Sequence, residues 1–131
     1  MIANLPPTVS PVVVCAPNAF KGTLTAAAAA AAMARGVAHR SAVPRLAPVA
    51  DGGDGTLDVL LLAAGSSARL TRHGVTGPLG GRVTARLGWL GSDVAVVELA
   101  EASGLRLLRS RSLDALRATS CGTGELLRAA L

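Results

Sequence analysis

The chain has 131 residues, the length of one domain, and half of them are apolar. Only 16% are charged, which excludes a chain kept disordered by its charge and leaves enough Ala, Val and Leu for a core. The formal net charge is +5, but aromatic residues make up only 2% and do not interleave with the arginines, so we expect no nucleic-acid partner and keep a basic nucleic-acid binder only as a third alternative.

The first half of the chain repeats one pattern, a strand followed by a loop and a helix. After a loose leader at 1–11, the run VVVCAP predicts a buried strand, and an Ala-rich helix follows at about 24–40, with Thr23 or Thr25 as its cap. A second strand, RLAPVA, is expected at 45–50. The repeat predicts an α/β domain with Rossmann-like parallel units over 12–66.

The second helix is expected at about 57–64, with Thr56 as a candidate cap and Gly65 at its end. Beyond it the pattern changes, and 67–131 forms the next region. The segments ARLTRHGV, RVTARLGWL and VAVVELA, separated by TGPLGG and GSD, predict a mixed or antiparallel patch of strands. His73 in this patch is expected to be a surface or hydrogen-bonded histidine.

A last helix is predicted to begin at about Thr123 or Gly124. The chain stops within this apolar helix, which we interpret as a truncated chain and an incomplete sheet. An incomplete sheet leaves apolar surface exposed, so a homo-oligomer is possible. Two cysteines without CxxC spacing predict neither a metal site nor a disulfide framework. We expect no targeting segment, no membrane partner and a cytoplasmic protein.

Three loops stand before helix starts: NAFKGT, ADGGDGT and TSCGTGE. Such loops gather at the carboxyl ends of parallel strands, where ligands bind, and helix N-termini attract anions. None of them is a Walker A loop, and ordinary turn chemistry remains the alternative for each. Lys21 is the one lysine among thirteen basic residues, and a compact ammonium suits phosphate.

Carboxylates are the most specific feature of these loops. Asp51 comes directly after the predicted second strand, where a carboxylate can hold Mg²⁺ or take a proton from a hydroxyl. Asp54 could do the same, or could favour the helix start through the helix dipole. Glu98 lies inside an apolar run, so its carboxylate needs a partner.

Five motifs occur in an order typical of one family: APNAFKGTLTA, PVADGGDGT, VTGPLG, ELAEASGL and CGTGELL. From Val12 to Leu131 the chain resembles bacterial glycerate kinases of the type that makes 2-phosphoglycerate. The resemblance implies ATP-dependent phosphoryl transfer to a hydroxyl of D-glycerate, with Mg²⁺. It also implies a two-domain α/β enzyme roughly three times this long, of which this chain is the N-terminal third and is inactive alone. A nonenzymatic α/β fragment or small-ligand binding module is the alternative.

The resemblance also assigns roles to residues. Lys21 would hold a phosphate or the glycerate carboxylate, and Asp51 would coordinate Mg²⁺ or act as the base, which makes these two the catalytic candidates. Three positions depart from the family pattern: Asn18 replaces an aspartate, Asp54 a glutamate and Cys121 a tyrosine. The substrate- and nucleotide-binding candidates are Asn18, Gly52, Gly53, Thr56, Glu101, Ser103, Gly122, Thr123 and Gly124.

Overall fold

The structure, a computed structural model, describes residues 9–108 and 113–131. The described chain falls into two units, with the boundary between Ala50 and Asp51. The predicted leader lies mostly outside the described residues. We predicted that the second helix, at about 57–64, belongs with the first two strands. In the structure this helix packs against the strands that follow it.

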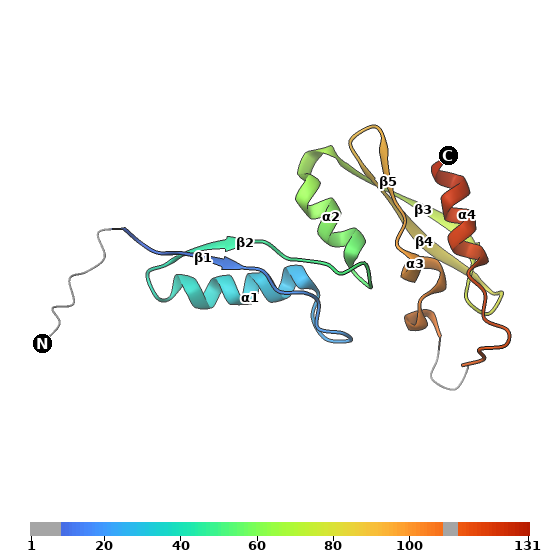
Figure 1. Cartoon of the computed structure of the whole chain (residues 1–131), viewed down its shortest axis with the longest axis horizontal. Coiled ribbons are helices and arrows are strands. Elements are labelled where there is room, and N and C mark those ends of the chain that lie inside the picture. Colours follow the sequence, from blue (N-terminus) through green and yellow to red (C-terminus); the bar gives the residue numbers. More distant parts are fainter. Residues whose placement is uncertain (1–8, 109–112) are drawn as a thin grey trace, which may run out of the picture. The chain divides into compact units, whose positions relative to one another are not determined.

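The first unit contains two parallel strands and one helix, β1 (Val12–Cys15), α1 (Ala26–Ala38) and β2 (Val43–Leu46). α1 lies along the strand pair (Figure 1), and its buried alanines allow a close approach to the strands. The Thr25 hydroxyl caps α1 by accepting a hydrogen bond from the Ala28 N–H at 3.2 Å, as one of the two predicted caps. The parallel strand–helix–strand arrangement is therefore confirmed.

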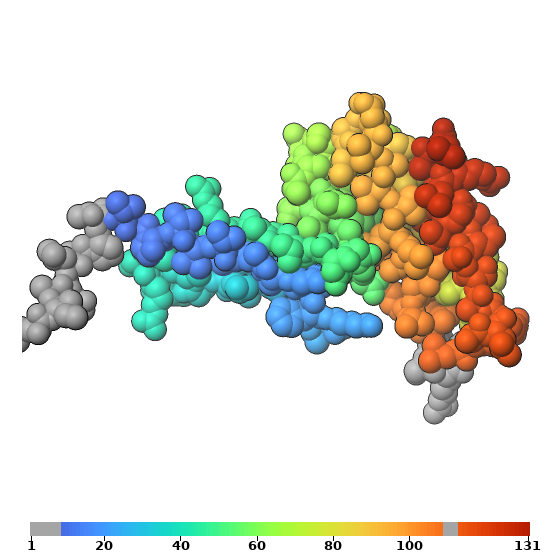
Figure 2. Space-filling view, in the orientation of Figure 1, coloured from blue at the N-terminus to red at the C-terminus, as the bar shows by residue number. Residues whose placement is uncertain are grey.

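The second strand differs from its expected position at 45–50. β2 begins at Val43 because this residue pairs with Val12, the first residue of β1. Past Leu46, the N–H groups of Ala47 and Val49 still donate to the carbonyls of Cys15 and Pro17, so the chain stays beside β1 beyond the regular strand. The loop between β1 and α1 projects from this unit in the space-filling view (Figure 2).

The second unit is built around an antiparallel sheet in the order β3-β4-β5. Its strands are β3 (Ala68–Thr76), β4 (Arg82–Leu90) and β5 (Val94–Val96), and its helices are α2 (Thr56–Ala64), α3 (Leu99–Ser103) and α4 (Cys121–Ala130). Two short 3₁₀ helices, Gly65–Ser67 and Leu105–Leu107, complete it. The predicted antiparallel patch is confirmed.

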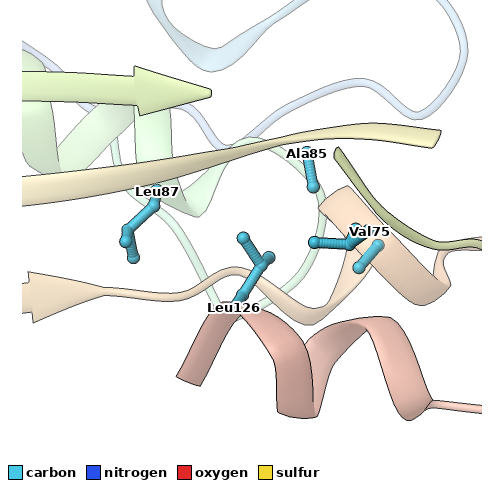
Figure 3. Close-up of a cluster of buried hydrophobic side chains, with 5 residues drawn as sticks. Val75, Ala85, Leu87 and Leu126 are labelled. Carbon is cyan, nitrogen blue, oxygen red and sulfur yellow. The ribbon is translucent and has the colours of Figure 1, made fainter. Parts of the chain in front are cut away.

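The two faces of this sheet carry different helices. On one face Gly88 lies directly beneath Leu57 and Leu61 of α2, so the absence of a side chain lets the helix approach β4. On the other face Leu126 of α4 points toward Val75 and Leu87 (Figure 3). The buried cluster on this second face consists of Val75, Ala85, Leu87, Ala102 and Leu126.

Three boundaries in the second unit differ from the sequence prediction. β5 has only three residues, and Glu98 is the residue before α3 rather than part of a strand. α4 begins at Cys121, before the predicted Thr123, because the Ser120 carbonyl already accepts from the N–H groups of Thr123 and Gly124. Thr56 is the first residue of α2 and does not cap it.

Candidate functional site

The acidic loop, residues 51–55, is shaped by its own side chains and glycines. An Asp51 carboxylate oxygen accepts a hydrogen bond from the Gly53 N–H at 3.1 Å, which forms a tight aspartate turn. Gly52 and Gly55 have φ values of +92° and +91°, a conformation that residues with side chains rarely adopt. The Thr56 hydroxyl closes the loop by donating to the Gly53 carbonyl at 2.8 Å. Local hydrogen bonds and glycines therefore shape most of this loop.

The sequence predicted that Asp51 comes directly after the second strand, but the structure shows that it does not. β2 ends at Leu46, and residues 47–50 lie between the strand and Asp51 because the chain continues in extended form past the regular pairing. Asp51 is exposed, as are Gly52, Gly53 and Asp54. The turn therefore fixes the position of a carboxylate at the surface of the loop.

Glu98 binds the backbone amides at the start of α2, although it lies 41 residues from Leu57 and 43 residues from Gly55 in the sequence. One carboxylate oxygen accepts from the Leu57 N–H at 2.8 Å, and the other accepts from the Gly55 N–H at 3.1 Å. Glu98 is 4% exposed. The buried carboxylate that the sequence left without a partner is thus bound to the free amides of a helix N-terminus.

Glu101 lies at the centre of a chain of alternating charges. One of its oxygens is 2.8 Å from Arg86 and 2.5 Å from Arg106, and the other accepts the Arg86 backbone N–H at 3.0 Å. Arg86 also contacts Asp58 at 2.6 Å, and Arg106 contacts Asp54 at 3.2 Å. Asp54 and Asp58 thus join the acidic loop and α2 to the segment around α3.

These contacts change the proton affinities of the ionic groups. Burial alone would raise the pKa of Glu101, but the hydrogen bonds and charge of Arg86, with the charge of Arg106, outweigh burial and lower it. The hydrogen bond to Glu101, then that to Asp58, raises the pKa of Arg86 still further above its ordinary value. Glu101 is therefore a carboxylate that stays ionised.

The start of α4 brings two predicted site residues together. The hydroxyls of Ser103 and Thr123 are hydrogen-bonded at 2.8 Å. Gly122 is buried, and a Cβ atom there would overlap the backbone oxygen of Thr76, so this glycine permits helix–strand packing. Gly124 faces open space, because no atom lies within 4 Å of the position that a Cβ atom would occupy.

Glu125 fastens the same helix to β3. Its carboxylate accepts from the Thr76 N–H at 2.9 Å and from the Thr76 hydroxyl at 2.7 Å. These hydrogen bonds lower the pKa of Glu125. With Glu98 and Glu101, this makes three glutamates that bind backbone N–H groups of the second unit.

In the first unit, the predicted residues lie in the loop between β1 and α1. The Asn18 side-chain oxygen accepts from the Ala19 N–H at 2.7 Å, which fixes the beginning of the loop. Phe20 and Leu24 pair across a tight turn that contains Gly22, whose φ is +77°. Lys21 lies in this turn and is exposed, so its ammonium is available to an anion.

Sequence reasoning missed the arginines of the ionic chain. Arg106 belongs to a run of arginines whose pattern is typical of a solvated face, and Arg86 has no local feature that sets it apart within its predicted strand. The one indication in the sequence is Glu101 itself, since a buried carboxylate requires cationic or N–H partners. His73, as expected, is hydrogen-bonded: its ring nitrogen lies 2.9 Å from the Thr71 hydroxyl.

Within residues 9–108 and 113–131, no group of three or more His, Cys, Asp or Glu side chains is arranged to hold a metal ion. Mg²⁺ in phosphotransferase sites commonly has one or two protein carboxylates, with substrate phosphates and water as the other ligands, so Asp51 alone fits such a site. A hollow of about 150 Å³ beside the 77–81 turn includes none of the predicted site residues in its lining. No helix in the described part of the chain has the length and apolarity to cross a membrane.

Comparison with known proteins gives consistent matches over almost the whole chain. The model of a family described as "Glycerate kinase family" matches residues 13–131. Glycerate kinase of Bacillus subtilis (strain 168) is 44% identical over 124 residues, which are 91% of this chain and 31% of that protein. Glycerate 2-kinase of Escherichia coli (strain K12) is 40% identical over 124 residues, 91% of this chain and 32% of that protein.

A solved structure gives the same result. The crystal structure of a glycerate kinase 2 from Salmonella typhimurium LT2 is similar to this chain with a TM-score of 0.66 and 37% sequence identity, over 93% of this chain and 33% of that one. The chain therefore spans about a third of the length of the relatives it matches.

Proposed function

Because the chain belongs to the glycerate kinase family, we propose that it forms the N-terminal third of an enzyme that transfers a phosphoryl group from ATP to a hydroxyl of D-glycerate, giving 2-phosphoglycerate. The observation that carries this proposal is the exposed Asp51, held in a turn by its own hydrogen bond to Gly53, within the motif that resembles the family. Phosphoryl transfer requires mainly positioning and charge neutralisation, which a fixed carboxylate supports.

In this proposal Asp51 orients the glycerate hydroxyl and accepts its proton, or is a Mg²⁺ ligand. Mg²⁺, when bound with ATP, would neutralise charge on the phosphates. Lys21 holds an anionic group, either a phosphate or the glycerate carboxylate. Asn18, Gly52, Gly53 and Thr56 shape the two loops, and the paired hydroxyls of Ser103 and Thr123 belong to the binding surface together with Glu101, Gly122 and Gly124.

The test is the Asp51→Asn variant in a full-length version of the enzyme that carries this sequence. We expect turnover with glycerate and ATP to fall by roughly two orders of magnitude or more, as for loss of a general base, while the circular dichroism spectrum stays unchanged. Asp93→Asn, which alters an exposed carboxylate in the turn before β5, is the matched control and should keep normal turnover. Near-normal activity of Asp51→Asn would contradict the assignment of Asp51.

The alternative is a nonenzymatic α/β fragment or small-ligand binding module, and the chain matches 31% of the length of the Bacillus subtilis relative. The 131-residue chain by itself should show no ATP-dependent phosphorylation of glycerate, because the remaining two thirds would carry part of the site. A coupled ADP-release assay measures this. Whether the encoding DNA continues in frame past Leu131 distinguishes the module from the N-terminal part of an enzyme.

A further inference from the structure

Glu98 holds the far end of the acidic loop. Its two oxygens bind the N–H groups of Gly55 and Leu57 at 3.1 and 2.8 Å, and its side chain is 4% exposed. Gly55, the residue before α2, makes no side-chain cap of its own, and its φ of +91° is left-handed. The last residue of the loop therefore depends on a carboxylate from another segment for its hydrogen bond and its position.

The same segment makes a second connection to the loop. Glu101, three residues after Glu98 and at 4% exposure, binds Arg106, and Arg106 in turn binds Asp54 at 3.2 Å. Arg106 and Asp54 are each about half exposed, so this connection is weakened by solvent, whereas that of Glu98 is buried. Glu98 is accordingly the stronger of the two connections.

The loop is short, so fixing its end also fixes Asp51. Gly53 lies between the two anchored points: its N–H donates to Asp51, and its carbonyl accepts from the Thr56 hydroxyl at 2.8 Å and from the Thr56 N–H at 3.2 Å. A shift of Gly55 would therefore be transmitted through Thr56 and Gly53 to the Asp51 carboxylate.

We propose that Glu98 is a positioning residue, which sets the place of the Asp51 carboxylate by clamping the Gly55 and Leu57 amides. This role rests on the proposed function of Asp51. A consequence is that the Gly55 and Leu57 amides at the start of α2 are already occupied by an internal anion and do not bind substrate phosphate, although a glycine-rich loop before a helix commonly has that use.

The clamp is tested first by amide hydrogen exchange, measured by NMR on the 131-residue chain. In the unchanged chain the Gly55 and Leu57 amides should exchange more slowly than unbound loop amides. Glu98→Gln keeps the shape but presents an NH₂ group to one of the two amides, which should then exchange roughly tenfold to a hundredfold faster. Fast exchange at both amides in the unchanged chain overturns the proposal without any variant, even if Glu98→Gln fails to fold.

The positioning role is tested in the full-length version. Glu98→Gln should lower kcat roughly tenfold or more and change KM for ATP less than it changes kcat, because a carboxylate that accepts the hydroxyl proton acts mainly in the transition state. Asp58→Asn is the matched control: it removes a carboxylate from the same turn of α2, but one that binds the Arg86 side chain rather than the loop backbone. It should preserve both kcat and the two slow amides.

The outcomes separate the two proposals. Faster exchange together with lower kcat supports the positioning role, and faster exchange with unchanged kcat overturns it while leaving the proposed function intact. If the unchanged full-length protein does not phosphorylate glycerate, the proposed function fails and the positioning role fails with it. The exchange measurement then still shows whether Glu98 holds the loop.

Discussion

At the scale of residues, the second unit uses carboxylates to bind backbone N–H groups that no helix or strand partner reaches. Glu98 does so at the start of α2, and Glu125 does so at Thr76. Glu101 binds the N–H of Arg86, which pairs with Arg72 of β3 but has no partner on the β5 side, because β5 pairs only with residues 88–90. An unpaired buried N–H group costs free energy, so each glutamate stabilises the fold.

Glu101 gives a prediction on acid stability. Its folded pKa is lowered, so its contribution is fully present above the unfolded value of about 4.3 and is lost as the pH falls through the folded value. Glu101→Gln should cost about 3 kcal/mol at pH 7, as for a broken buried ion pair with a half-exposed partner. The substitution should also make the free energy of unfolding decline less steeply with pH below about 4.3.

Urea unfolding of both proteins between neutral pH and about pH 3 measures this difference. The pKa of Glu125 is also lowered, so its contribution to stability is lost at low pH in both proteins. This contribution therefore cancels when the two proteins are compared. Parallel pH curves for the two proteins would show that Glu101 does not carry the acid sensitivity.

Gly122 gives a second prediction at this scale. Gly122→Ala places a methyl group against the Thr76 backbone oxygen, which cannot move aside, so we expect a loss of about 3 kcal/mol or more from overpacking. Gly124→Ala, one half-turn along the same helix, has open space and should raise stability by up to about 1 kcal/mol. Thermal unfolding compares them, and equal effects would refute the packing role of Gly122.

At the scale of elements, sequence patterns predicted the elements with strong local signatures. α1 follows from its alanine run and the Thr25 cap, and β3 and β4 follow from alternation with Gly and Pro in the turn between them. The conformation of the acidic loop was also implicit in its glycines. The start of α2 was predicted to within one residue, but the binding of its amides by Glu98 could not be predicted, because Glu98 lies more than forty residues away.

The packing of α4 gives a prediction for an element. Leu126 is fully buried among Val75, Leu87 and their neighbours (Figure 3), whereas the adjacent Leu127 is 54% exposed. Leu126→Ala should cost about 2–5 kcal/mol through the lost contacts and the cavity. Leu127→Ala should cost less than about 1 kcal/mol. Chemical denaturation measures both, and similar losses would mean that α4 does not pack as described.

At the scale of the whole molecule, residues 9–50 of the first unit provide a pair of strands, β1 and β2, against which α1 packs. Val12 and Val14 are each 60% exposed, and strand alternation places them on the same face of β1. Val43, paired with Val12, is 44% exposed. This valine face is more apolar than the surface of a finished α/β unit.

We predict that the 131-residue chain associates with itself through the valine face. Sedimentation velocity should show a molecular mass that rises with concentration, and the Val12→Thr/Val14→Thr double variant should remain closer to the monomer. Val94→Thr, at a 52% exposed valine of β5, is the control and should associate as the unchanged chain does. A monomer at every concentration would contradict the prediction, and an equal effect of Val94→Thr would place the contact elsewhere.

The residues of the candidate site were found from the sequence mainly by resemblance, and the family is shown by the match over 13–131. The pairing of Ser103 with Thr123 brought two of the predicted residues together. The ionic chain through Arg86 and Arg106 was not predictable, since it joins the acidic loop, β4 and the segment after α3, and no local pattern specifies such partners.

The remote hydrogen bonds of Glu98 also have a consequence for the order of folding. Bringing Glu98 to the Gly55 and Leu57 amides closes a chain segment of more than forty residues, and this has an entropic cost that a local helix cap does not have. During synthesis, the first turn of α2 leaves the ribosome well before Glu98 does, so we expect the acidic loop to reach its final shape only after β4 and β5 have formed. The loop proposed to do the chemistry would then be among the last parts of this unit to become ordered.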